Sequence, residues 1–62
     1  MSKLEYACLS TGCDLEEVQA IIENSKQEHA ENHADMSWNS FVDEWVQFEY
    51  CLPRSVLEAL YV

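Results

Sequence analysis

The stretch from Ser37 to Leu52 constrains this chain more than any other, because it gathers the aromatic residues at helical spacing. It holds both tryptophans and both phenylalanines of the sequence. Its largest apolar residues recur at gaps of three and four, which is the repeat of one face of an α-helix. These residues are Trp38, Phe41, Trp45, Phe48 and Leu52. The pattern predicts a long central helix around which the rest of the chain is organised.

Apolar periodicity and helix-end signals predict four helices in all. Gly12 suits the left-handed residue that ends a helix, and Asp14 is a good N-cap for the next one. Pro53 ends the central helix and suits the first turn of another. We therefore expect helices over about residues 3–10, 14–30, 38–51 and 53–60.

No internal repeat or flexible linker divides the chain, so residues 1–62 are expected to form one all-α domain, a bundle of three to four helices. The apolar stripe of the second helix stops after Ile22. The extent of helix through residues 24–36 therefore stays open, between a solvated helical arm and a loop.

The central helix carries more apolar residues than a subunit of this size is expected to bury. Left-over apolar surface normally marks an interface, and a symmetric homodimer is its commonest form. We therefore expect a homodimer or a partner interface on this helix, formed by Trp38, Phe41, Val42, Trp45, Val46 and Phe48. The alternative is that the aromatic stripe is simply the core of a monomer.

The chain has a formal net charge of -9, from 12 acidic residues against three basic ones. Affinity for nucleic acids and for anionic membranes comes mainly from Lys and Arg, so both classes of partner are disfavoured. No apolar run reaches the length of a membrane span. Proteins with a basic surface are the expected partners. Alternatively, the charge serves only solubility.

Residues 4–23 resemble a helix-turn-helix unit. The positions that carry the resemblance are small or apolar, around one glycine: Cys8, Gly12, Cys13, Val18 and Ile21. In DNA-binding members of that class the second helix enters the major groove. Here that helix would present an acidic surface, formed by Asp14, Glu16, Glu17 and Glu23. The acidic surface favours protein contacts, and the alternative function is a helix-turn-helix DNA-binding transcriptional regulator.

In size, charge and element pattern the chain is similar to small acidic early proteins of lambdoid temperate phages. That resemblance implies a protein that redirects a host regulator, or phage development, through protein contacts in the host cytoplasm. The three cysteines, Cys8, Cys13 and Cys51, contain no CxxC pair. They predict a reduced, cytoplasmic chain without a disulfide.

His29 and His33 are four residues apart and lie among carboxylates, so a helix would present them on one face. Zinc could bind such a pair, but no third ligand can be assigned. The alternative, two exposed histidines on a polar arm, is preferred. A chain with one glycine has no phosphate-binding glycine loop, and nothing supplies an oxyanion hole. We expect no enzymatic activity, cofactor or metal, and predict a regulator that acts by protein binding.

Overall fold

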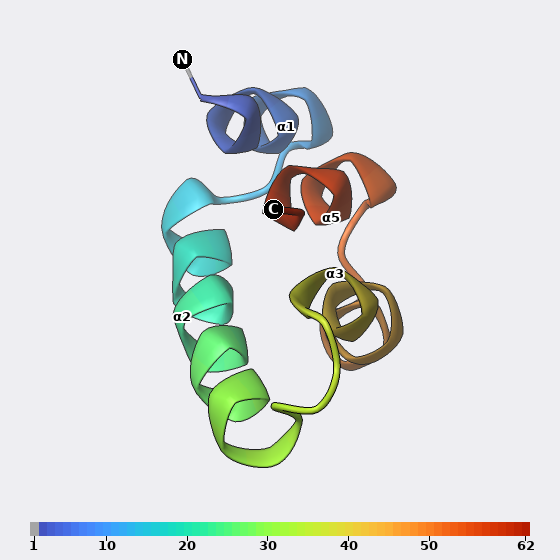
Figure 1. Cartoon of the computed structure of the whole chain (residues 1–62). Coiled ribbons are helices and arrows are strands. Elements are labelled where there is room, and N and C mark those ends of the chain that lie inside the picture. Colours follow the sequence, from blue (N-terminus) through green and yellow to red (C-terminus); the bar gives the residue numbers. More distant parts are fainter. Residues whose placement is uncertain (1) are drawn as a thin grey trace.

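The computed structural model describes residues 2–62, which form four helical stretches and no strand (Figure 1). The predicted all-α class is therefore confirmed for the described residues. The elements are α1 (Lys3–Thr11), α2 (Leu15–Asn32), a continuous central helix made of α3 (Trp38–Phe41), η1 (Val42–Val46) and α4 (Gln47–Tyr50), and α5 (Arg54–Leu60). Within residues 2–62, no helix combines the length and apolar character that a membrane span requires.

The turn between α1 and α2 follows from its local sequence. Gly12 has a φ of 75°, a left-handed conformation that side chains with a Cβ rarely adopt, and it ends α1 as predicted. Asp14 then accepts a hydrogen bond from the backbone N–H of Glu16 at 2.9 Å, which confirms it as the N-cap of α2. α2 continues to Asn32, so most of the segment left open by the sequence is helical.

The central helix departs from α geometry over the one turn called η1. There the backbone N–H of Gln47 bonds to the carbonyl of Val42, five residues earlier, which makes this a π-turn. A π-turn holds one extra residue, so it rotates every later side chain by about one position around the helix axis. Tyr50 consequently packs against the core, whereas Phe48 is 83% exposed.

Phe48 therefore leaves the stripe in which its sequence spacing placed it. The predicted stripe is wrong at this position because it extended a regular α-helical repeat through a wider turn. That Phe48 meets a partner stays a prediction.

The helix predicted to run to residue 51 ends one residue earlier. Cys51 has a φ of 52°, in the left-handed region, and turns the chain toward Pro53. Proline disfavours helical geometry at the residue before it, so the helix has to end ahead of Leu52. Pro53 then becomes the N-cap of α5.

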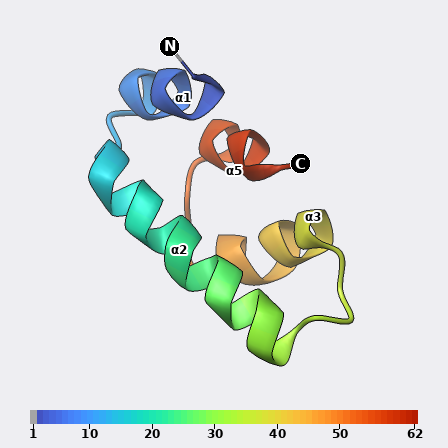
Figure 2. The ribbon, with the colours of Figure 1, turned by 60° about the vertical axis from the view of Figure 1, so that its left-hand side comes forward.

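Two hydrophobic clusters form the core, and α5 contributes to both of them. One cluster joins α5 to the central helix and contains Phe41, Val42, Val46, Leu57 and Leu60. The other joins α5 to the α1–α2 pair and contains Ala7, Cys8, Val18 and Val56. Figure 2 shows the corresponding arrangement, with α5 between α1 and the central helix. α5 is thus the element that connects the two halves of the chain.

Three of the predicted interface residues lie in this core. Phe41, Val42 and Val46 are each 0% exposed. The prediction that these three meet a partner is wrong, because α5 covers the central helix from one side and α2 covers its aromatic side. A chain of this size can therefore bury most of the stripe by itself.

Candidate functional site

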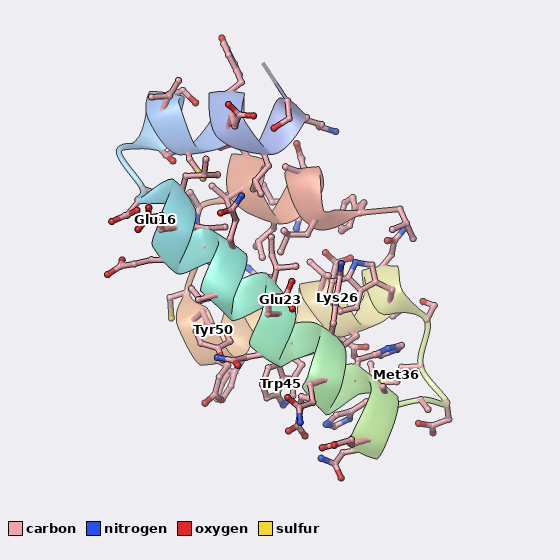
Figure 3. The ribbon with its side chains drawn as sticks, turned by 90° about the vertical axis from the view of Figure 1, so that its left-hand side faces the viewer. Glu16, Glu23, Lys26, Met36, Trp45 and Tyr50 are labelled. Atoms are coloured by element: carbon pink, nitrogen blue, oxygen red, sulfur yellow. The ribbon has the colours of Figure 1, made fainter. Side chains whose placement is uncertain are left out.

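The acidic residues predicted on the second helix lie exposed along the N-terminal half of α2, with Asp14 as its N-cap. We call Asp14, Glu16, Glu17 and Glu23 the acidic face, and all four are exposed. Figure 3 shows Glu16 projecting from the first turn of α2, with Glu23 further along the same helix. Among residues 2–62, no ion pair involves any member of the acidic face. The face therefore presents its charge to solvent.

Part of this charge has a structural role. Carboxylates in the first turn of a helix interact favourably with its N–H groups and dipole, which applies to Glu16 and Glu17, while Asp14 is the N-cap. The helix dipole acts only within the first turn, so it does not account for Glu23. The acidic face therefore extends beyond what the helix needs for its own stability.

Arg54 lies elsewhere in the fold and does not neutralise the acidic face. It lies 3.5 Å from a carboxylate oxygen of Asp43 and 3.6 Å from one of Glu58. Tyr61 also donates its hydroxyl to Asp43. This hydrogen bond, together with desolvation, raises the pKa of Tyr61. The positive charge of Arg54 is thus paired with carboxylates where the central helix meets α5.

The two histidines are half-buried and face inward. His29 packs on Trp38 and Phe41 at ring-centroid distances of 5.7 Å and 5.0 Å. His33 packs on Phe41 and Trp45 at 5.2 Å and 6.1 Å. Within residues 2–62, no group of three possible ligands is arranged to hold a metal ion. The preferred alternative, two exposed histidines, is wrong, because both rings cover the aromatic side of the central helix.

A hydrogen bond fixes the orientation of His29. Its Nε2 lies 2.7 Å from the backbone carbonyl oxygen of Met36. Because a carbonyl only accepts hydrogen bonds, this geometry places a proton on Nε2. His33 Nε2 lies 3.5 Å from a carboxylate oxygen of Glu28. Both imidazoles therefore hold the end of α2 and the following loop against the central helix.

The inward stripe of α2 continues beyond Ile22, where the sequence had suggested that it stops. It passes through Ser25, His29 and His33, at gaps of three and four residues. The signal was present in the spacing. It was missed because these three residues, one serine and two histidines, were counted as polar.

The remaining predicted interface residues differ in exposure. Trp38 and Trp45 are partly buried in the aromatic cluster, in which the rings of Phe41 and Trp45 stack at 5.0 Å and 12°. Phe48 stands apart on the outer side of the central helix. Beside it lies a hollow of about 350 Å³. Its lining residues are Asp43, Glu44, Gln47 and Phe48, and we call the hollow with these four residues the Phe48 surface.

The thiols are all free in the described chain. Cys8 is 2% exposed, and burial is the main cause that raises its pKa, with smaller contributions from Cys13 and Asp14. A buried, protonated thiol acts as a small apolar residue and is a poor nucleophile. Cys8 therefore serves the packing of α1 against α2 and α5.

No family model, curated protein or solved structure matches this chain.

Proposed function

We propose that this chain is a regulatory protein that acts by binding a basic surface of another protein through the acidic face of α2. The observation that supports this most directly is the set of exposed carboxylates without ion-pair partners among the described residues. Complementary charge accelerates association and selects against wrong partners. A binding role therefore uses carboxylates that form no ion pair with the rest of the described chain.

The packing of α2 makes this face rigid. Val18 is 2% exposed and lies in the cluster with Cys8 and Val56, which fixes the first half of the helix. At the other end, His29 and His33 pack on the central helix. A surface held in place before binding loses little conformational entropy when a partner arrives. The acidic face is therefore suited to recognising a partner of fixed shape.

Binding to DNA through the helix-turn-helix-like pair is the alternative. It would bring Glu16, Glu17 and Glu23 of α2 toward phosphates, and like charges repel. Nonspecific affinity for DNA depends on Lys and Arg, of which the whole chain has three. The same surface fits a basic, DNA-binding protein better than it fits DNA. A phage-encoded modulator of a host regulator, acting in the cytoplasm, would match this description.

The homodimer expected from the sequence lacks much of the exposed apolar surface that would form its interface. Three of its six residues are interior, which leaves Phe48 and the exposed parts of Trp38 and Trp45. Two copies would also bring together chains of net charge -9, which Coulomb repulsion opposes. We therefore propose a monomer that meets a basic partner, and light scattering at high protein concentration tests this point.

The test compares two triple variants of equal charge. One replaces Glu16, Glu17 and Glu23 by lysine, and the control replaces Glu5, Glu31 and Glu49, which are also exposed, by lysine. Proteins captured from a native extract by the wild type should be retained by the control and lost with the α2 variant. Capture should also weaken as salt is added.

Direct DNA binding is measured in parallel, by anisotropy of a labelled duplex at low salt. Tight, salt-sensitive binding of the wild type to DNA would contradict the proposal. Equal loss of the captured proteins in both triple variants would show that net charge, and not the acidic face, is responsible.

A further inference from the structure

Phe48 is solvent-exposed because of the π-turn that precedes it. Without the extra residue of η1, its position in the sequence pattern would continue the stripe of Trp38, Phe41 and Trp45. With it, the side chain is 83% exposed and Tyr50 takes the inward position. Single π-turns interrupt α-helical hydrogen bonding and occur often at functional sites. The fold thus leaves the ring of this phenylalanine exposed to solvent instead of burying it.

The ring does not stand alone on a flat surface. It borders the hollow of about 350 Å³, whose other lining residues are Asp43, Glu44 and Gln47. Asp43 is already held by Arg54 and by the Tyr61 hydroxyl. Glu44 is exposed and forms no ion pair with any residue from 2 to 62. The hollow therefore offers an aromatic face beside an unpaired carboxylate and a side-chain amide.

This combination fits a guanidinium group. A planar cation is attracted to an aromatic face and donates paired hydrogen bonds to a carboxylate. The amide oxygen of Gln47 can accept a further bond. An anionic side chain is disfavoured by the carboxylates and by the net charge of -9. A second copy of this chain is disfavoured for the same reason, and its Arg54 is already paired.

We infer that the Phe48 surface binds an arginine side chain of a basic partner protein. The guanidinium lies over the Phe48 ring and pairs with the carboxylate of Glu44. The inference rests on the proposed function, since it names an anchor point for the same class of partner. It adds a second contact on the central helix, separate in sequence from the acidic face of α2.

The probe is a capped peptide of alternating alanine and arginine, titrated into isotope-labelled full chain and followed by NMR. Its control is the same peptide with citrulline, which keeps the shape of arginine and lacks its charge. The arginine peptide should shift the resonances of residues 43–48, including the Phe48 ring. The citrulline peptide should shift them much less.

Three variants locate the contact. Phe48→Ala and Phe48→Leu both remove the aromatic face, and Phe48→Leu keeps apolar volume; each should weaken binding at residues 43–48 by roughly threefold or more. Glu44→Gln removes the charge and should also weaken it. Glu5→Gln, an exposed carboxylate outside both surfaces, should leave these shifts unchanged. Because Phe48 and Glu44 are exposed, the fold should survive each change, which circular dichroism checks.

The outcomes separate this inference from the proposed function. Shifts confined to residues 14–23 and unaffected by Phe48→Ala would overturn the arginine site and leave the acidic face as the binding surface. Shifts at residues 43–48 that are equal with citrulline would overturn recognition of the cation. No shift at residues 43–48 would likewise overturn the inference, while capture through the acidic face would still test the function separately.

Discussion

Trp38 donates its indole N–H to the backbone carbonyl of Leu60 at 2.7 Å, which joins the start of the central helix to the end of α5. Next to it, the side-chain amide of Asn39 exchanges two hydrogen bonds with the backbone of Val62, at 3.0 Å and 3.3 Å. The last carbonyls of a helix have no partner within the helix itself. Trp38 therefore gives the Leu60 carbonyl at the end of α5 a hydrogen-bond partner, while its ring packs in the core.

Replacing Trp38 by phenylalanine should lower the free energy of unfolding by about 1 to 2 kcal/mol. The change removes the donor and leaves the Leu60 carbonyl partly buried without a partner, although much of the ring packing is kept. Chemical denaturation measures the effect. Asn39→Ala serves as a comparison and should have a smaller effect, because its bonds to Val62 are exposed. A Trp38→Phe variant as stable as the wild type would show that the indole bond contributes nothing.

Ser25→Ala should stabilise the chain by about 1 kcal/mol. Ser25 is 0% exposed, and its hydroxyl oxygen has no hydrogen-bond partner among the described residues. Removing a buried, unpaired hydroxyl relieves its desolvation penalty, and alanine also has the higher helix propensity. The control is Ser55→Ala, at an exposed position of α5, which should change stability little. Destabilisation by Ser25→Ala would indicate that the hydroxyl has a partner in solution, such as a buried water.

Cys51→Gly should raise the melting temperature by a few degrees. A residue with a side chain in the left-handed conformation is strained by about 1 kcal/mol, and glycine removes this strain. Part of the gain is offset because glycine also gives the unfolded chain more freedom. Cys51→Val, which is branched at Cβ, should lower the melting temperature instead. Equal melting temperatures for the glycine and valine variants would contradict the left-handed assignment.

The helix ends could be predicted from sequence because their causes are local. Gly12 and Asp14 act through their own backbone conformation and through bonds to residues within one turn. Pro53 similarly restricts only its neighbours. The acidic face could be predicted for the same kind of reason, since charged residues at the start of an amphipathic helix have little alternative to solvent.

The π-turn could not be predicted in this way. In this turn the backbone N–H of Gln47 bonds to the carbonyl of Val42 in place of an ordinary α-helical bond. Backbone groups can form either kind of bond, so packing against the other helices decides between π and α geometry. The exposure of Phe48 follows from that choice and was therefore missed. The inward histidines are a different case, because His29 and His33 have the correct spacing and were overlooked through their polarity alone. Spacing is thus the more reliable guide to burial on α2, and residue type the less reliable one.

Ionisation of Tyr61 should require a higher pH than is usual for a tyrosine side chain. Its hydroxyl donates to Asp43, and this bond is the main cause that raises its pKa above the ordinary value near 10. A group whose pKa is raised in the folded state stabilises the fold below its unfolded pKa, and this contribution is lost as the pH passes the folded pKa. The stabilisation is therefore complete at neutral pH and disappears only in strong alkali.

Tyrosinate absorbance during an alkaline titration measures this ionisation directly. In Tyr61→Phe the step above the usual tyrosine range should be missing, and in Asp43→Asn it should move to lower pH, because an amide does not hold the hydroxyl proton as a carboxylate does. Tyr6→Phe is the matched control, since Tyr6 is 68% exposed and the step assigned to Tyr61 should remain in this variant. If the raised step survives in Tyr61→Phe, the hydrogen bond to Asp43 is not formed in solution.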